Sequence, residues 1–315
     1  MTETVEIDGI EITLSRTRKV FFPEDNITKG DLIEYYRRIA DTMLPHLRGR
    51  PVTMLRFPNG IKGYRFYQKE APEYFPAWIR RLTVEKENGT VTHLVCDNAA
   101  ALVYLADQAC ISIHTWLSRE DNLYCPDQII FDLDPPGVDF KPVKEAALEL
   151  RNLLREVGMT PYVKSTGSRG LHVVVPLDMS AGFDDVRNFA QEIAGLLCQR
   201  CPDRLTMEIS KAKRKGRLYL DIRRNFYAQM AVATYSVRAK PGAPVAAALN
   251  WEEVEDEELG PQDYRITNIF DHLEKTGDPW SGMSEKACSI EKARRAMRAM
   301  PAGASCQGHS GPCIL

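Results

Sequence analysis

Apolar residues recur at helical spacing between residues 28 and 48. They follow a threonine at position 28 with an acidic residue three positions later, a combination typical of a helix N-terminus. The apolar positions that share one face of the helical repeat are Leu32, Ile33, Tyr36, Ile39, Met43 and Leu47. The pattern therefore predicts an amphipathic helix over residues 28–48.

Shorter patterns follow this helix. Runs rich in β-branched and aromatic residues predict strands at 52–57, 64–68 and 111–115, and a continuous apolar stretch predicts a helix over 98–108. We expect residues 1–125 to form a mixed α/β subdomain.

The pattern becomes more regular after residue 128. It predicts, in order, a strand at 128–134, a helix at 143–157, strands at 161–164 and 171–176, a helix at 184–198, and strands at 205–208 and 217–222. This alternation predicts an α+β fold in which an open sheet carries helices on one face. We assign residues 126–283 to this second subdomain and expect it to interlock with the first.

The end of the chain differs in composition from both subdomains. An acidic run at 252–258 precedes a short predicted helix at 266–275, and a basic helix is predicted over 284–300. Residues 301–315 are small and glycine-containing, which is typical of a disordered tail. Residues 284–315 therefore form a third segment.

Overall charge says little about partners. The chain has 315 residues, of which 41 are basic and 43 acidic, so its formal net charge is only −2. Any affinity for nucleic acid must then come from local basic clusters. The first residues lack the basic start and apolar stretch of a signal peptide, and no apolar run reaches membrane-spanning length. We expect a cytoplasmic protein with no membrane partner.

The strongest chemical signal is the pair Asp132 and Asp134 in Ile129-Ile130-Phe131-Asp132-Leu133-Asp134-Pro135-Pro136. Side chains alternate along a strand, so both carboxylates point to one face, and the two prolines end the strand there. Paired carboxylates at a strand end can share divalent cations in a two-metal phosphoryl-transfer site. Two solvated aspartates at a strand end are the competing interpretation.

A third carboxylate closes a later apolar strand. Asp221 stands in Arg217-Leu218-Tyr219-Leu220-Asp221-Ile222-Arg223-Arg224 and could reach the same metals. The alternative for Asp221 is a salt bridge to Arg223 or Arg224.

Between these aspartates lies a turn rich in glycine and hydroxyl groups, Ser165-Thr166-Gly167-Ser168-Arg169-Gly170-Leu171-His172. Its backbone amides could hold phosphate, with charge from Arg169 and a donor from His172. Such turns are more often only turns. The basic run 211–217 is likewise either a solvated loop or a site for triphosphate or template backbone, and His114 on its predicted strand is more often structural.

Taken together, these motifs resemble the polymerase domain of bacterial and archaeal ligase D, a member of the archaeo-eukaryotic primase superfamily. The resemblance runs from about residue 15 to about residue 280. It implies a primase-like catalytic core with an RRM-like sheet, and two divalent metal ions, Mn²⁺ or Mg²⁺, held by Asp132, Asp134 and Asp221. Thr166 and Arg169 depart from the family's serine and lysine but keep the hydroxyl and the charge. The nucleotide contacts that the resemblance implies are His114, Thr166, Ser168, Arg169, His172, Arg214 and Arg238.

The resemblance also implies contacts to DNA. Lys19 and Lys29 correspond to the lysines with which the family binds the 5′-phosphate across a gap, and Arg16 replaces an asparagine beside them. Phe66 and Tyr67 fall where the family places aromatic residues that stack on template or base.

The implied activity is gap-filling nucleotidyl transfer in non-homologous end joining, with a preference for ribonucleotides and manganese. The implied partners are gapped or broken DNA ends with a 5′-phosphate, nucleoside triphosphates, a separate DNA ligase and the Ku protein. No ligase signature is present, so we expect a stand-alone polymerase.

Three other functions share part of this pattern. A replicative primase would use the same aspartates, although the sequence lacks a four-ligand zinc cluster. A module that binds or bridges DNA ends would use the same basic residues, with catalysis incidental. A metal-dependent nuclease has only the carboxylates in its favour.

Overall fold

Residues 28–48 form two helices where the pattern predicts one. Helix α1 (Lys29–Arg38) begins at Thr28, whose side chain accepts a hydrogen bond from the backbone of Asp31 in a reciprocal capping box. The helix is interrupted at Ile39, and α2 (Ala40–Leu47) follows with Pro45 inside it. Proline has no N–H to donate within a helix, which weakens the hydrogen bonding of this second segment. The predicted single helix is therefore wrong in its continuity, although both segments bury their apolar residues.

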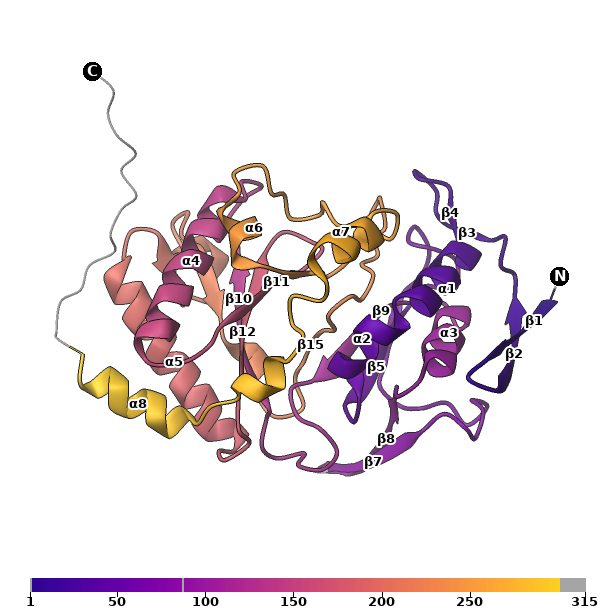
Figure 1. Cartoon of the computed structure of the whole chain (residues 1–315), viewed down its shortest axis with the longest axis horizontal. Helices are drawn as coiled ribbons and strands as arrows, with labels where there is room; N and C mark the ends of the chain where they lie inside the picture. The colour runs from indigo at the N-terminus through magenta and orange to yellow at the C-terminus, as the bar shows by residue number, and fades with distance from the viewer. Residues whose placement is uncertain (1, 87, 301–315) are drawn as a thin grey trace, which may run out of the picture.

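The computed structural model describes residues 2–86 and 88–300, and its first large sheet has the strand order β15-β9-β5-β8-β7, with β6 paired to β5 (Figure 1). Its pairings are antiparallel. Asn98 caps the helix that precedes β9. The strands are β5 (Pro51–Arg56), β6 (Phe66–Gln68), β7 (Arg81–Lys86), β8 (Gly89–Val95), β9 (Cys110–Trp116) and β15 (Met230–Val232), and the helix is α3 (Ala99–Asp107).

Two small hairpins precede this sheet. One pairs β1 (Thr2–Ile7) with β2 (Ile10–Ser15), and the other pairs β3 (Val20–Phe22) with β4 (Ile27–Thr28). The first turns through Asp8 and Gly9, with φ of 53° and 73°, as a two-residue hairpin loop requires.

The second large sheet has the order β13-β14-β10-β12-β11-β16. Helices α4 and α5 lie side by side and cover one of its faces, so the predicted arrangement of strands and helices is confirmed (Figure 1). The elements are β10 (Gln128–Asp134), α4 (Lys141–Glu156), β11 (Tyr162–Ser165), β12 (Leu171–Pro176), α5 (Phe183–Arg200), β13 (Leu205–Thr206), β14 (Leu218–Asp221) and β16 (Ala248–Leu249), with the single-turn 3₁₀ helices η1 (Lys211–Lys213) and η2 (Arg223–Asn225).

The last part of the described chain contains α6 (Trp251–Glu255), α7 (Ile269–Thr276), the 3₁₀ helix η3 (Met283–Lys286) and α8 (Ile290–Arg298). Helix α6 packs against α4 and α8 against α5, whereas Phe270 of α7 packs against Tyr35 of α1. The basic helix predicted over 284–300 is thus divided, because Ser289 is extended and caps α8. The tail predicted over 301–315 lies outside the described residues.

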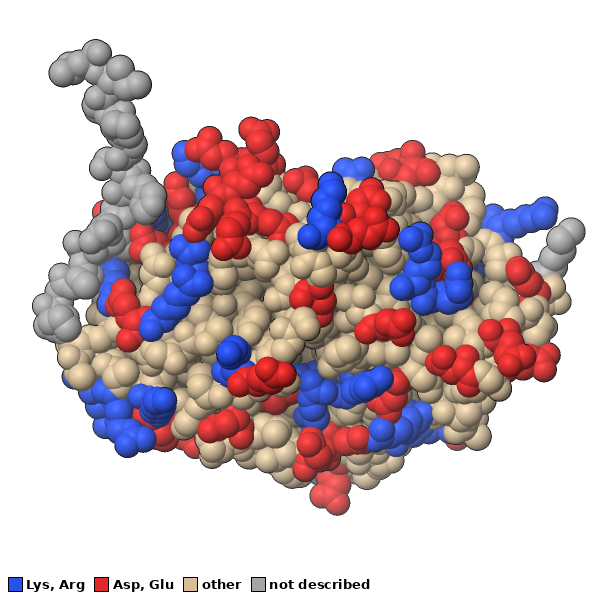
Figure 2. Space-filling view, viewed as in Figure 1, with Lys and Arg blue, Asp and Glu red and all other residues tan. Residues whose placement is uncertain are grey.

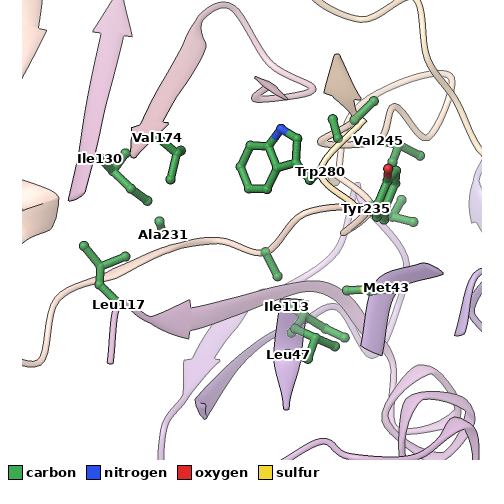
Figure 3. Close-up of a cluster of buried hydrophobic side chains, with 14 of the residues drawn as sticks. Met43, Leu47, Ile113, Leu117, Ile130, Val174, Ala231, Tyr235, Val245 and Trp280 are labelled. Carbon is green, nitrogen blue, oxygen red and sulfur yellow. The ribbon is translucent and has the colours of Figure 1, made fainter. Parts of the chain in front are cut away.

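Apolar side chains lie between the two large sheets (Figure 3). Ile130 and Val174, from the face of the second sheet opposite α4 and α5, lie near Ala231 of the first sheet, with Trp280 beside them, whereas Ile113 lies next to Leu47 of α2. Side chains two residues apart on a strand share a face, so Asp132 follows Ile130 along this interface. The polar residues of β10 therefore lie where the apolar contact between the sheets ends.

Surface charge is mixed. On the face shown in Figure 2, acidic and basic side chains are interspersed, and acidic side chains gather over α6. This face offers no continuous basic stripe for a nucleic acid backbone. None of the helices in the described ranges is both long enough and apolar enough to cross a membrane.

Candidate active site

Asp132 lies at the centre of three paired strands. Strand β10 is antiparallel to β12 on one side and to β14 on the other, and this register places Asp132 opposite both His172 and Asp221. Asp134 points to the same face, opposite Tyr219. The structure thus brings the three predicted carboxylates to one face of adjacent strands.

A cavity of about 580 Å³ opens over this face. It collects residues from distant parts of the chain, including every predicted metal ligand, every predicted nucleotide contact and Tyr67. The predicted residues that line it are Tyr67, His114, Asp132, Asp134, Thr166, Ser168, Arg169, His172, Arg214, Asp221 and Arg238.

Arginines compensate the charge of the β10 carboxylates. Asp134 lies 3.1 Å from Arg169 and 3.6 Å from Arg214. Asp132 lies 3.4 Å from Nε of Arg224 and 3.5 Å from Nε2 of His172. Burial alone would raise the pKa of Asp132, but His172 and Arg224 outweigh it and lower that pKa to about 2. Asp132 is therefore ionised at neutral pH.

Asp221 forms the salt bridge that the sequence left open. Its carboxylate accepts from Nη2 of Arg223 at 2.7 Å, from Nε at 3.0 Å and from the Arg223 backbone N–H at 2.8 Å. The hydrogen bond to Asp221 raises the pKa of Arg223, so this guanidinium keeps its charge. Arg223 must turn aside before Asp221 can bind a cation.

The donor set fits divalent cations in kind but is not assembled as a metal centre. Among residues 2–86 and 88–300, no three His, Cys, Asp or Glu side chains are grouped closely enough to hold a metal ion. Carboxylate oxygens are nevertheless the ligands that hard cations prefer, and those of Asp132, Asp134 and Asp221 share one face. Each is now neutralised by an arginine, a charge that cations could replace.

His114 is an unpaired polar group in this cavity. Its Nε2 is buried and has no hydrogen-bond partner within the described part of the chain, and its ring meets the edge of Tyr67 at 5.7 Å. Burial, helped by the charges of Arg238 and Arg224, lowers the pKa of His114 to about 3. A neutral imidazole with a free nitrogen at a cavity wall can form a hydrogen bond with a ligand hydroxyl.

We expect a His114→Gln variant to lose less stability on acidification than the wild type. Unfolded, His114 has a pKa of 6.5, and folded it has a pKa of about 3. Between these pH values only the unfolded chain binds the extra proton, so falling pH removes stability from the wild type, by about 2 kcal/mol at about pH 5. Urea unfolding of both proteins at about pH 7.5 and about pH 5 measures the difference. Equal losses would show that His114 titrates normally.

His172 is the second histidine with a free nitrogen. It is buried, its Nε2 faces Asp132, and its Nδ1 has no partner among the residues described. Burial lowers its pKa despite the opposing effect of Asp132, so the ring is neutral at pH 7.

The turn between β11 and β12 is pressed against the end of β10. A Cβ on Gly170 would collide with the carbonyl oxygen of Leu133, and Gly167 has a φ of +59° that favours glycine. The Thr166 hydroxyl donates to the carbonyl of Gly170 at 3.0 Å, and Arg238 donates to the carbonyl of Thr166 at 3.1 Å. These contacts fix Arg169 and His172 on either side of the turn, next to the two aspartates of β10.

The residues predicted to bind a 5′-phosphate lie apart from the cavity. Lys19 is partly exposed and donates to the carbonyl of Pro58 at 2.7 Å, whereas Lys29 is buried and pairs with Asp107 at 2.7 Å. Burial lowers the pKa of Lys29, and the nearby charges of Arg16 and Lys19 lower it further. The three cations form one cluster, in which Lys29 already has an acidic partner.

Phe66 and Tyr67 point to different places. Tyr67 lines the cavity, while Phe66 stacks on Tyr64 at 5.7 Å with the guanidinium of Arg56 over its ring. Of these two residues, only Tyr67 lines the cavity over Asp132.

Several residues that line the cavity are not among the site residues predicted from the sequence. Arg223 and Arg224 were considered only as salt-bridge partners of Asp221, and Tyr219 carries the Arg214 guanidinium 3.9 Å above its ring. Tyr219 could have been found, because it alternates with Asp221 on an apolar strand. The others that line the cavity without a predicted role include Lys69, Gln229 and Met230.

Comparison with known families and proteins gives a consistent result. The family described as "LigD, primase-polymerase domain" matches residues 28–280. The multifunctional non-homologous end joining protein LigD of Mycolicibacterium smegmatis is 33% identical over 270 residues, which are 85% of this chain and 35% of that protein. The bifunctional non-homologous end joining protein LigD of Bacillus subtilis is 33% identical over 268 residues, 83% of this chain and 42% of that protein. The chain thus spans less than half the length of these relatives.

A solved structure matches over almost its whole length. The polymerase domain from Mycobacterium tuberculosis ligase D, in complex with DNA, has a TM-score of 0.82 at 30% identity and covers 88% of this chain and 99% of that one. The expected primase-like α+β fold is confirmed.

Proposed function

Because the chain belongs to the LigD primase-polymerase domain family, whose members are nucleotidyltransferases, we propose that it extends the 3′ end of a DNA strand across a gap during the repair of broken ends. The observation that carries this proposal is the register that places Asp132 between His172 and Asp221 under one cavity. Carboxylates, arginines and neutral histidines around one cavity suit a substrate with a triphosphate.

In the proposed reaction, the primer 3′-hydroxyl oxygen bonds to the α-phosphorus of a nucleoside triphosphate, and pyrophosphate leaves. Arg169 and Arg214 lie beside Asp134 and can each turn a guanidinium to the phosphate oxygens. His172 can offer a hydrogen bond to the same group. The edge-on contact of Tyr67 with His114 leaves the exposed ring of Tyr67 available to a base.

Asp132, Asp134 and Asp221 would hold two divalent cations, displacing the arginines that now pair with them. Such ions lower the pKa of the attacking hydroxyl and stabilise the charge that develops on phosphate oxygens. Arg223 and Arg224, once released from the carboxylates, remain at the cavity wall and can contact the phosphates of the entering strand.

The experiment that tests the function is extension of a 5′-phosphorylated gapped duplex, comparing ribo- with deoxyribonucleotides under Mn²⁺ and Mg²⁺. We expect extension of the 3′ end, with ribonucleotides and Mn²⁺ preferred. Products made without a primer would indicate a primase instead. Shortened strands would indicate a nuclease, and bound but unchanged DNA would indicate a bridging module.

We further propose that Lys19 binds the 5′-phosphate on the far side of the gap. Lys19 is partly exposed, and its ammonium donates to the side-chain oxygen of Asn59 at 2.6 Å. A Lys19→Ala variant should extend phosphorylated and unphosphorylated gaps at the same rate, because the ammonium that attracts the 5′-phosphate is gone. The control is Lys62→Ala, which removes an exposed lysine that pairs with Glu24. A phosphate preference that survives in Lys19→Ala would disprove this role.

A nucleotidyltransferase of this kind leaves a nick that another activity must seal. We therefore propose a DNA ligase and the Ku protein as partners of this chain. The proposal rests on the end-joining function named for its relatives in Mycolicibacterium smegmatis and Bacillus subtilis.

A further inference from the structure

The segment between β14 and β15 carries exposed aromatic rings beside the cavity. Its two ends, Arg223 with Arg224 and Gln229 with Met230, line the cavity. Between them stand Phe226 and Tyr227, which are 41% and 36% exposed. The gap-filling mechanism above gives these two rings no role.

A third ring extends this surface. Tyr124, from the loop between β9 and β10, is 65% exposed and stacks on Tyr227 at 5.5 Å with an interplanar angle of 10°. Tyr227 in turn packs edge-on against Trp116 and Phe183, which support it from below. We call Tyr124, Phe226 and Tyr227 the aromatic ledge.

The ledge is fixed to the strand that carries Asp132. Asn225 is fully buried and forms two hydrogen bonds with the backbone of Ile130, one donated at 2.7 Å and one accepted at 2.9 Å. The chain then turns tightly, with Ala228 at a φ of +58° and a hydrogen bond from Gln229 N–H to the Phe226 carbonyl. The rings are therefore held in place relative to the catalytic face.

Charges around the ledge are of the sign that nucleic acid requires. The Arg187 guanidinium lies 4.9 Å from the ring centre of Phe226, although it also pairs with Asp184. Arg223 and Arg224 directly precede Asn225, and their side chains are 52% and 41% exposed. Exposed aromatic faces next to arginines are the surface that single-stranded nucleic acid uses.

We propose that the aromatic ledge stacks the last unpaired bases of the strand whose 3′ end enters the cavity. This inference rests on the proposed function, because it requires a 3′ end at Asp132 and Asp221. Arg223 and Arg224 line the cavity and lie between Asp221 and Phe226 in the chain, so a strand that leaves the cavity along these two arginines comes to the ledge. Tyr67 is a separate aromatic position. It lies on β6, and strands β5 and β9 stand between β6 and β15, the strand that follows the ledge.

The ledge thus adapts the protein to broken ends with a 3′ overhang. In a filled duplex the bases near the 3′ end are paired and stacked on each other, so they have no free face for Tyr124 or Phe226. An unpaired 3′ overhang has such faces, and stacking them on fixed rings would hold the 3′-hydroxyl near the carboxylates.

The test uses an oligonucleotide duplex with a 3′ overhang that carries 2-aminopurine near its 3′ end, because stacking quenches this base. Binding is measured with the whole chain, without metal or nucleotide. We expect quenching with the wild type and much weaker quenching with Tyr124→Leu/Phe226→Leu, which keeps apolar bulk but removes two of the three π-faces. Tyr124→Phe/Phe226→Tyr keeps the rings and should keep the quenching, and Val138→Ser serves as an exposed apolar control.

Extension provides a second measurement. For the leucine double variant, KM for the 3′-overhang primer should rise about tenfold, since stacking one base contributes on the order of 1–3 kcal/mol. KM for a gapped duplex with a paired 3′ end should stay at the wild-type value. If the double variant unfolds, Tyr124→Leu alone is used, because that ring is largely exposed.

Equal quenching by the leucine and ring-preserving variants would overturn the proposal. Quenching only when 2-aminopurine is in the template strand would also overturn it. So would the absence of quenching by the wild type, which is the result expected if the ledge binds a protein. A wild type that quenches but extends no primer would refute the polymerase function while leaving the stacking surface established.

Discussion

Replacing Asp132 with asparagine should lower the rate of primer extension at least about a thousandfold. The two side chains have the same shape, so the change removes only the charge that lies between Arg224 and His172. With a pKa of about 2, Asp132 is ionised at any working pH, and its charge is what would hold a divalent cation. The measurement is single-turnover extension of a gapped duplex under Mn²⁺.

The same variant should bind gapped DNA as tightly as the wild type, because the cationic cluster of Arg16, Lys19 and Lys29 lies outside the cavity. Fluorescence anisotropy with labelled DNA measures this affinity. Asp139→Asn is a matched control, since Asp139 is exposed and follows the same strand. Extension by Asp132→Asn within about tenfold of the wild-type rate would show that this carboxylate is not a metal ligand.

Replacing Lys29 with methionine should lower the free energy of unfolding by about 3 kcal/mol. Lys29 is buried and donates to Asp107 and to the hydroxyl of Ser15, so the variant leaves a buried carboxylate without its cation. Removing one partner of a buried ion pair typically costs this amount. Urea unfolding at about pH 7 provides the measurement.

The double variant Lys29→Met/Asp107→Leu separates charge from packing. It removes both charges and should recover much of the lost stability, because no uncompensated charge remains. If Lys29→Met alone is as stable as the wild type, the ion pair contributes nothing. A loss of phosphate preference in Lys29→Met must be read together with its stability, so Lys19→Ala is the cleaner test of phosphate binding.

The catalytic strand could be predicted from the sequence because its signal is local. Alternation along 128–134 fixes the shared face of Asp132 and Asp134, and Pro135 fixes the end of the strand. Which strands lie beside β10 depends on pairings over long distances in the chain. The register that places Asp221 opposite Asp132 is therefore a result of the structure alone.

Two hairpins, β1–β2 and β7–β8, are absent from the sequence prediction although the sequence carries turn signals for both. Asp8-Gly9 and Asn88-Gly89 are dipeptides typical of hairpin turns. The first joins β1 to β2, and the second stands where β8 begins. Strands β15 and β16 have three and two residues, too few for any periodic pattern to appear.

The surroundings of Lys29 and Phe66 could not be read from their neighbours in sequence. Asp107 lies 78 residues from Lys29, and nothing near either residue indicates that they pair. Phe66 and Tyr67 are adjacent on a strand and so point to opposite faces, but only the fold shows that the face of Tyr67 is the one that meets the cavity. The resemblance identified the residue types, whereas the fold determines which of them are free to contact a ligand.

The most direct test of nucleotidyl transfer is to count pyrophosphate against added nucleotides on a 5′-phosphorylated gapped duplex. The arrangement of Asp132, Asp134 and Asp221 under one cavity predicts one pyrophosphate for each nucleotide joined to the 3′ end. Pyrophosphate release and extension should both be lost in Asp132→Asn. A wild-type protein that binds this duplex yet releases no pyrophosphate and adds no nucleotide, with either Mn²⁺ or Mg²⁺, would contradict the assignment.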